Sequence, residues 1–277
     1  MKQSSLLCST GAFTRSSSPG WESYQAILRY GPLLEADGLE VLFYSSWYPD
    51  VEHIAGELRA SGLRFPVIHT EKGIGPALGS AEPEEQAQGI KQLAVNCRFA
   101  SQVGARLAVL HLWGWPGSDE HLERNLEMLA ACLTTAAEEG LELAIETLPC
   151  VRADPLSNVQ RAIEQDERCL VALDTEFLAL YQQLEASLEA TWLWQGGHVR
   201  HVHIKDYDGL VAEPDGRRRF LHPGDGHIDF AGFFKGLAAQ GFRGSISLEA
   251  SGLQRDCSID IERIQASLAF LRKLLAR

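Results

Sequence analysis

The stretch LELAIE, residues Leu141–Glu146, decides the fold of this chain. Apolar side chains fill most of its positions and it ends on a carboxylate, a pattern typical of a strand that is buried on both faces. Two similar stretches are LAVLHL at Leu107–Leu112 and CLVALD at Cys169–Asp174. Strands of this kind occur in parallel sheets covered by helices, so the sequence predicts an α/β protein.

Apolar stretches alternate with segments of helical period from one end of the chain to the other. The predicted strands are Ser5–Ser9, Leu39–Tyr44, Phe65–His69, Leu107–Leu112, Leu141–Glu146, Leu170–Asp174, Val199–Ile204 and Ser245–Glu249. The predicted helices are Gly20–Arg29, Val51–Ser61, Glu84–Val103, Asp119–Glu139, Asn158–Gln165, Leu178–Ser187, Phe230–Gln240 and Ile259–Leu275. Eight such units in about 250 residues match a closed (β/α)8 TIM barrel better than an open sheet.

Residues at the expected helix ends support these boundaries. Glycines stand where helix C-caps are expected, at Gly62, Gly104, Gly140 and Gly241. Asp119 and Asp229 are the expected N-caps of two helices. No G-x-G-x-x-G or G-K-[ST] motif follows the first predicted strand, so the sequence argues against a dinucleotide-binding fold and a P-loop fold.

Charge and length restrict the class of protein. The 277 residues are 45% hydrophobic, and no linker-like stretch divides them, so we expect a single TIM-barrel domain over residues 1–277. Against 37 acidic residues stand 25 Lys and Arg, which gives a net charge of −12. Such a surface repels phosphate backbones and anionic lipid. We therefore expect neither nucleic acid nor membrane as a partner, and a homo-oligomer is compatible with the sequence.

Cysteine usage and hydropathy predict a cytoplasmic protein. The six cysteines are scattered without a C-x-x-C pair: Cys8, Cys97, Cys132, Cys150, Cys169 and Cys257. We expect them to be reduced and mostly buried. The apolar patch around Leu6 is too short for the core of a signal peptide, and no stretch of about 18 apolar residues predicts a membrane span.

Metal-capable side chains stand at or near the C-terminal ends of six predicted strands: His69, His111, Glu146, Asp174, His203 and Glu249. Any one of them alone is more often a helix cap, a solvated charge or a hydrogen-bonded core residue. A parallel barrel, however, brings the C-terminal ends of its strands to one rim. Several carboxylates gathered there would repel one another without a cation. The pattern therefore predicts a divalent-metal site at this rim.

Three carboxylates and one imidazole suit Mn²⁺, Mg²⁺, Co²⁺ or Zn²⁺ and argue against a closed structural zinc site. The remaining coordination positions would be open to substrate oxygens. A bound ion of this kind polarises a carbonyl and stabilises an enediolate, while a nearby Glu moves a carbon-bound proton.

Several motifs together resemble a known family. They are LAIETLP at Leu143–Pro149, ALDT at Ala172–Thr175, HVHIKD at His201–Asp206, PGDGHIDF at Pro223–Phe230 and ISLEAS at Ile246–Ser251. As a set they resemble the xylose-isomerase-like TIM-barrel superfamily of sugar-phosphate isomerases and epimerases, to which endonuclease-IV-like enzymes are distantly related. The first two predicted strands contribute little to this resemblance.

The resemblance implies roles for particular residues. One divalent ion would be bound by Glu146, Asp174, His203 and Glu249. Glu146 and Glu249 would also act as the catalytic acid/base pair on opposite faces of the substrate. His201 points the same way along its strand as His203 and is a candidate supporting group. One departure is Phe177, which stands three residues after Asp174, where many relatives carry a substrate-contacting or metal-binding His.

Further side chains are predicted to contact the substrate: His69, His111, Trp113, Lys205 and Arg219. Trp113 and Trp115 offer either an apolar wall for a sugar ring or packing for a long loop. Arg219 belongs to a run of three arginines, 217–219, that either contacts the substrate or forms a solvated basic loop. Lys205 and Asp206 are expected to form an ion pair that braces the rim. PGDGHIDF is expected to form a turn that leads into a helix N-cap.

The leading functional prediction is a metal-dependent isomerase or epimerase that acts on a small sugar, sugar phosphate or polyol through an enediolate. A close alternative is an inosose-dehydratase-like enzyme, in which the same intermediate expels a hydroxyl group. A phosphodiesterase like endonuclease IV would also place histidines at His69 and His111. The acidic charge argues against it, and so does the sequence Arg218-Arg219-Phe220, which stands where those enzymes carry a D-x-H pair after the seventh strand. A sugar-binding barrel without activity is the remaining alternative.

Overall fold

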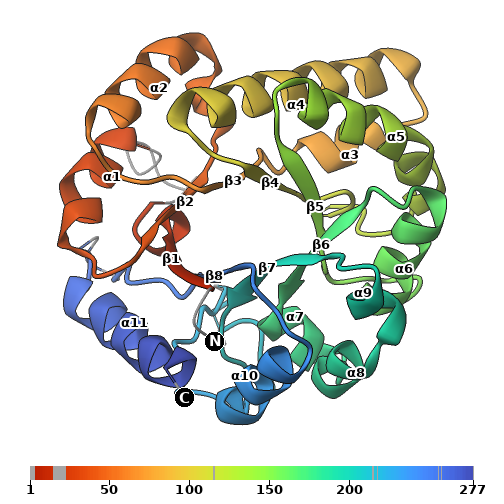
Figure 1. Ribbon diagram of the computed structural model, residues 1–277. Coiled ribbons are helices and arrows are strands. Elements are labelled where there is room, and N and C mark those ends of the chain that lie inside the picture. The colour runs from red at the N-terminus through yellow and green to blue at the C-terminus, as the bar shows by residue number, and fades with distance from the viewer. Residues whose placement is uncertain are drawn as a thin grey trace. The chain divides into compact units, whose positions relative to one another are not determined.

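The computed structural model describes residues 4–14, 23–114, 116–213, 215–216, 218–254, 256 and 258–276. Eight parallel strands form a closed barrel in which they follow one another in chain order (Figure 1). Their bounds are β1 Ser5–Ser9, β2 Gly38–Leu42, β3 Val67–His69, β4 Leu107–Leu110, β5 Glu142–Glu146, β6 Leu170–Asp174, β7 Val199–Ile204 and β8 Ser245–Leu248. The predicted (β/α)8 barrel is thereby confirmed.

The chain forms two compact units, one of Met1–Glu40 with Leu173–Arg277 and the other of Val41–Ala172. The first contains β1, β7 and β8, and the second contains β3, β4 and β5. The expectation of one domain over residues 1–277 stays a prediction.

In the second unit the register of β3 on β4 pairs His69 with Val109, and that of β4 on β5 pairs Leu110 with Ile145. The side chains of Val109, Leu110 and Ile145 are fully buried, as expected of strands covered on both faces. The helices of this unit are η3 Ser45–Asp50, α2 Val51–Ala60, α3 Ile74–Leu78, α4 Pro83–Val103, α5 Leu122–Glu138 and α6 Pro155–Gln165.

In the first unit β8 lies between β1 and β7, with Leu248 paired to Cys8 on one side and to Ile204 on the other (Figure 1). This register brings the ends of three strands level, so residues at these ends share one edge of the unit. Its helices are η1 Thr10–Ala12, α1 Tyr24–Tyr30, η2 Gly31–Leu33, α7 Thr175–Leu180, α8 Leu184–Glu189, α9 Thr191–Gln195, α10 Phe230–Ala239 and α11 Ile261–Leu275.

Several helices differ from the predicted ones. The predicted helix Leu178–Ser187 is two helices, because Gln182 adopts the left-handed conformation at φ 56° and ends the first. That first helix begins earlier than predicted, since the carboxylate of Asp174 caps it by accepting from the backbone N–H of Glu176. The short helices α3 and α9 were not predicted. The start of the predicted helix Gly20–Arg29, residues 20–22, lies outside the described residues.

The predicted glycine C-caps are confirmed. Gly62, Gly104, Gly140 and Gly241 all have a positive φ, which L-residues with side chains rarely adopt. Asp229 is confirmed as an N-cap, because its side chain accepts from the backbone N–H of Gly232 at 3.0 Å.

The prediction that Asp119 is a helix N-cap was wrong, because the N-cap of α5 is His121. The carboxylate of Asp119 instead accepts from the backbone N–H groups of Val151, Arg152 and Ala153 at 2.6, 3.0 and 2.9 Å, and from the Asn158 amide at 3.1 Å. Burial alone would raise the pKa of Asp119, but these hydrogen bonds outweigh it and lower the pKa to about 2. Asp119 therefore holds the loop that follows β5.

The five described cysteines are free and buried, which agrees with the prediction of reduced, buried thiols. Burial raises the pKa of Cys97 and of Cys132 to about 12, so both are protonated at neutral pH. Cys257 lies outside the described residues. In the described part of the chain, no helix is long and apolar enough to cross a membrane.

We predict that Asp119→Ala lowers the free energy of unfolding by about 2–3 kcal/mol at pH 7, because four donors lose a charged acceptor. Urea unfolding measures this loss, and Asp229→Ala, which removes one cap, should cost about 1 kcal/mol. The folded pKa of Asp119 lies below its unfolded value of about 3.9. Its contribution is therefore present above pH ~4 and is lost as the pH falls towards 2. Equal losses for the two variants at pH 7 would contradict this role.

Candidate metal centre

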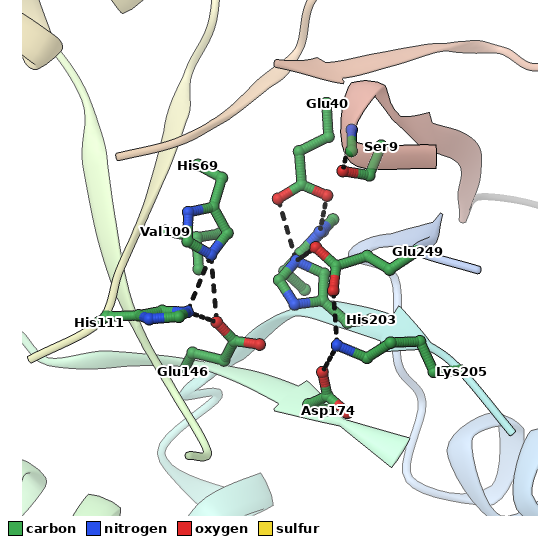
Figure 2. Close-up of polar contacts among 12 residues, drawn as sticks. Ser9, Glu40, His69, Val109, His111, Glu146, Asp174, His203, Lys205 and Glu249 are labelled. Atoms are coloured by element: carbon green, nitrogen blue, oxygen red, sulfur yellow. Dashed lines mark hydrogen bonds and ion pairs between the residues drawn. The ribbon is translucent and has the colours of Figure 1, made fainter. Parts of the chain in front are cut away.

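Two histidines of β7 share one buried carboxylate. His201 and His203 lie two residues apart on the strand, so both point to the same face, and both are fully buried. Glu40 of β2 is also fully buried, and its Oε1 lies 2.9 Å from His203 Nε2 (Figure 2). Its Oε2 lies 3.1 Å from His201 Nε2. Ser245 Oγ lies 2.6 Å from the other ring nitrogen of His201. The suggestion that His201 supports a ligand thus acquires a structural basis.

The charge of Glu40 follows from its neighbours. Burial would raise the pKa of this carboxyl, but the two imidazoles outweigh burial and hold the pKa well below its usual range. Glu40 is therefore ionised. It did not appear among the candidates from the sequence, although a carboxylate inside the apolar strand Gly38–Leu42 is a signal that could have identified it.

Lys205 connects two of the predicted ligands. Its ammonium nitrogen lies 2.5 Å from Asp174 Oδ2 and 2.7 Å from Glu249 Oε2 (Figure 2). Glu176 Oε2 lies farther away, at 3.9 Å. Only 4% of Lys205 is exposed, so the ammonium group and the two carboxylates neutralise one another away from water. Thr175 fixes the backbone of Lys205, since its Oγ1 donates to the Lys205 carbonyl at 2.7 Å.

The predicted ion pair between Lys205 and Asp206 was wrong. The side chains of neighbouring residues at a strand end point in opposite directions, so those of Lys205 and Asp206 point away from each other. Asp206 instead accepts four backbone N–H groups, those of Tyr207, Gly224, Gly226 and Ile228, at 2.8–3.1 Å. It thereby holds the turn within Pro223–Phe230, which confirms that this segment is a turn leading into a helix N-cap.

Asp174, His203 and Glu249 fit a divalent ion. Each offers one ligand atom, and these atoms lie within 4.8 Å of one another. Asp174 and His203 are fully buried, and the Glu249 side chain is 16% exposed. Two carboxylates and one imidazole match the oxygen-rich donor preference of Mn²⁺, Mg²⁺ or Co²⁺ and also serve Zn²⁺. The side-chain chemistry therefore supports these three residues as metal ligands.

A second group of metal-capable side chains lies in the other unit. Glu146 Oε2 is 2.6 Å from His111 Nε2 and 3.2 Å from His69 Nε2, and the two histidine nitrogens are 3.1 Å apart (Figure 2). His69 Nδ1 lies 2.9 Å from the carbonyl oxygen of Thr70, which can accept its proton. Two imidazoles and one carboxylate oxygen directed at one point can also hold a metal ion.

The protonation of His111 follows from its burial. Burial lowers its pKa to about 4, although the neighbouring Glu146 partly offsets this effect. His111 is therefore neutral at neutral pH and donates through one ring nitrogen. The sequence predicted His69 and His111 as substrate contacts and Glu146 as a metal ligand, and the structure places all three side by side.

Two cations lie near the ring of Phe177. The ammonium of Lys205 lies 4.7 Å from the centre of the Phe177 ring and the guanidinium of Arg218 lies 5.6 Å from it, both at cation–π distance. Arg218 also contacts Glu176 Oε1 at 2.5 Å and lies 5.4 Å from the Phe220 ring. The aromatic ring at position 177 thus offers a face to positive charge.

Arg219 has a different environment from its neighbour. Its guanidinium pairs with Asp208 at 2.8 Å and with Glu213 at 3.1 Å. Arg218, rather than Arg219, therefore reaches Glu176, which lies two residues after the predicted ligand Asp174. The third arginine of this run, Arg217, lies outside the described residues.

Trp113 is 1% exposed. A side chain this buried packs in the interior, which favours the packing alternative over an apolar wall for a sugar ring. Trp115 lies outside the described residues.

Comparison with known proteins places the chain in a family. The sequence profile of the xylose isomerase-like TIM barrel family matches residues 29–274. The chain belongs to this family. The resemblance seen in the five motifs is therefore confirmed.

A curated relative is the inosose dehydratase of Erwinia tasmaniensis, 29% identical over 182 residues. The match spans 59% of this chain and 59% of the length of that relative. Among solved structures, D-allulose 3-epimerase from Methylomonas sp. has a TM-score of 0.74 and 17% identity, over 99% of this chain and 98% of that chain. The 3-keto-D-glucoside 4-epimerase of E. coli has a TM-score of 0.69 and 20% identity, over 98% and 100%. At these identities the two structures show the shared fold.

We predict that Lys205→Met destabilises the metal-free protein by about 3 kcal/mol, because Asp174 and Glu249 lose their buried counter-charge. Thermal unfolding in the presence of a chelator measures the loss, and added Mn²⁺ should restore part of the stability. The control Arg161→Met breaks a half-exposed pair with Glu123 and should cost about 0–1 kcal/mol. Similar losses for both variants would contradict the role assigned to Lys205.

Proposed function

We propose that this chain is a divalent-metal-dependent isomerase or epimerase that moves a proton at a carbon next to a carbonyl group in a small sugar, sugar phosphate or polyol. The observation that carries the proposal is the convergence of Asp174, His203 and Glu249, whose ligand atoms lie within 4.8 Å of one another in one unit. Membership of the xylose isomerase-like family supports it, and so does the epimerase chemistry named for the structural neighbours.

In this proposal one ion, Mn²⁺, Mg²⁺, Co²⁺ or Zn²⁺, is held by Glu146, Asp174, His203 and Glu249. The ion, when bound, would polarise the substrate carbonyl and stabilise the enediolate that proton removal creates. Glu146 is the fourth proposed ligand because it ends β5, as Asp174 ends β6, and parallel barrel strands direct their C-terminal ends to one rim.

Glu146 and Glu249 are the proposed acid/base pair. Epimerisation removes a proton from one face of a carbon and returns a proton to the other, so it needs two proton-transferring groups. Lys205 contacts Oε2 of Glu249, and His111 and His69 contact Oε2 of Glu146. These contacts fix the orientation of each carboxylate, which keeps it aimed at the proton that it transfers.

The sequence predicted five substrate contacts, His69, His111, Trp113, Lys205 and Arg219. We propose His69, His111 and Lys205 as contacts, and Arg218 in addition. Its guanidinium stacks near Phe177 and Phe220 while the side chain stays 31% exposed. A fixed cation of this kind suits a hydroxyl-rich or anionic substrate. Arg219 is a weaker candidate, because Asp208 and Glu213 already occupy its donors.

Dehydration is the second candidate reaction, favoured by the 29% identity with an inosose dehydratase. Both reactions start by removing a proton next to a carbonyl group. They differ in the next step, because an epimerase returns a proton whereas a dehydratase expels a hydroxyl group from the neighbouring carbon.

We expect the purified protein with Mn²⁺ to exchange a carbon-bound proton of a ketose or keto-polyol with solvent D₂O. Proton NMR follows the exchange, and mass spectrometry of the same samples detects any loss of water. Exchange without loss of water rejects dehydration. Binding of the sugar with neither exchange nor turnover on a panel of ketoses and inososes would instead indicate a sugar-binding barrel without activity.

A phosphodiesterase is the least favoured alternative. The feature that supports it is the second group of metal-capable residues, His69, His111 and Glu146. A second ion bound there would give a multi-metal site. The net charge of −12 and Phe177 in place of a ligand speak against it. Metal analysis by mass spectrometry and an assay on abasic DNA separate the two. One ion per chain without cleavage rejects the phosphodiesterase.

We predict that Glu249→Gln and Glu146→Gln each lower kcat by about 10²–10⁴-fold, because an amide cannot take up or return the proton. Steady-state kinetics on the substrate found by proton exchange measures the effect. Glu213→Gln serves as the matched control, since this carboxylate pairs with Arg219 and is 42% exposed. Full activity of either of the first two variants would contradict the assignment of the acid/base pair.

A further inference from the structure

We propose that His222 is a positioning residue that holds the segment after β8, and with it Glu249, in place. The inference rests on the proposed function, because it takes Glu249 as a metal ligand and as one of the two acid/base groups. His222 stands in the loop after β7, directly before the turn within Pro223–Phe230. It therefore acts on Glu249 from another loop, through the backbone.

The imidazole of His222 joins two parts of the first unit. Only 7% of this residue is exposed. Its Nε2 lies 3.1 Å from the carbonyl oxygen of Ser251, and its Nδ1 lies 2.8 Å from Oγ of Ser267 in α11. A carbonyl oxygen only accepts hydrogen bonds, so Nε2 carries a proton and donates it to Ser251. The ring thus connects the segment after β8 to α11.

The contact with Ser251 is the same in both charge states of the ring. Burial is the main cause that lowers the pKa of His222, so the ring is neutral at neutral pH and its Nδ1 can accept from the Ser267 hydroxyl group. A protonated ring would instead donate from Nδ1, and the hydroxyl group would turn to the carbonyl oxygen of Arg263, 3.2 Å away. Nε2 donates to Ser251 in either case.

The backbone on both sides of His222 is anchored to the end of β7. The backbone N–H of Asp206 donates to the carbonyl of Leu221 at 3.0 Å, and the Asp206 carboxylate accepts from the backbone N–H of Gly224 at 2.8 Å. His222 lies between these two anchored residues. Its contact with Ser251 therefore ties the residues that follow β8 to those that follow β7.

Glu249 depends on contacts of this kind because the strand pairing ends beside it. β8 ends at Leu248, and the backbone N–H of Glu249 still donates to the carbonyl of Ile204 at 3.1 Å. Two residues further on, the carbonyl oxygen of Ser251 accepts from His222. The backbone that carries the Glu249 side chain is thus held on one side by β7 and on the other by His222.

The residue after Ser251 is packed too closely to move freely. The backbone N–H of Gly252 donates to the carbonyl of Ala12 at 2.8 Å. A Cβ atom at position 252 would lie 2.6 Å from Cδ1 of Ile264 in α11, so the absence of a side chain permits this close approach. The amide of Gly252 is therefore a sensitive reporter of how firmly the segment is held.

Two conservative substitutions separate the two contacts of His222. The amide nitrogen of His222→Gln lies as many bonds from Cβ as Nε2 of the imidazole, so it can still donate to Ser251. The amide nitrogen of His222→Asn lies as many bonds from Cβ as Nδ1, so it reaches only Ser267. Each variant keeps one hydrogen bond and loses the other. We therefore expect similar decreases in Tm, of about 1–3 °C.

We expect only His222→Asn to disturb the segment after β8. Hydrogen exchange at the Gly252 amide, followed by NMR without ligand, should become about 10-fold faster. The Kd for Mn²⁺ alone, measured by titration calorimetry, should rise by about 10-fold, because Glu249 loses its fixed orientation. His222→Gln and the control Ser267→Ala keep the contact with Ser251, so both should stay within about 2-fold of the parent chain.

His222→Phe fills a similar volume without a donor and should behave as His222→Asn does. The proposal is overturned if Gly252 exchanges equally fast in His222→Asn and His222→Gln, or if these two variants change the Kd for Mn²⁺ by the same factor. Equal effects would mean that His222 contributes to stability alone. If the parent chain binds no Mn²⁺, the metal centre of the proposed function fails, whereas exchange at Gly252 still decides whether His222 holds the segment.

Discussion

A buried carboxylate is destabilising by several kcal/mol unless hydrogen-bond donors or cations surround it, and this constraint organises the first unit. Glu40, Asp174, Glu176 and Asp206 are each at most 2% exposed. Each is compensated in a different way: Glu40 by two imidazoles, Asp174 by an ammonium group, Glu176 by a guanidinium group and Asp206 by four backbone N–H groups. The compensating groups come from β7 and the loop that follows it. That segment is therefore the electrostatic centre of the unit.

Lys205 neutralises two of the carboxylates that are proposed as metal ligands. Its ammonium group contacts the same two carboxylates, Asp174 and Glu249, that are proposed to hold a divalent ion. A metal ion and Lys205 would then share these oxygens, and the second oxygen of Glu176, 3.9 Å from the ammonium nitrogen, offers Lys205 another partner. The ammonium group also faces the Phe177 ring. Positive charge near the carboxylates is thus built into the fold, and an ion adds to it rather than creating it.

The sequence predicted features that are encoded in neighbouring residues, and it did not predict contacts between residues that are far apart in the chain. Strands β1, β6 and β7 were predicted with their observed bounds. In β6 the signal is a run of consecutive apolar residues, which is typical of a strand that is buried on both faces. The ligands at Asp174 and His203 could be proposed because strand ends converge in any parallel barrel. Glu40 was missed, since its partners lie 161 and 163 residues away and nothing local reports them. Asp119 was misread for a related reason: it binds a loop more than 30 residues away, where a local cap was expected.

Phe177 shows how the surroundings of a site constrain its chemistry. A histidine there would add a metal ligand or a substrate contact, and the phenyl ring can do neither. Its face instead lies near Lys205 and Arg218, which keeps two cations beside the buried carboxylates. Fewer ligands and more fixed positive charge fit a site that holds one ion and uses side chains to bind a hydroxyl-rich or anionic substrate. A site that must neutralise a phosphodiester with several ions would need further ligands, which the phenyl ring of Phe177 cannot supply.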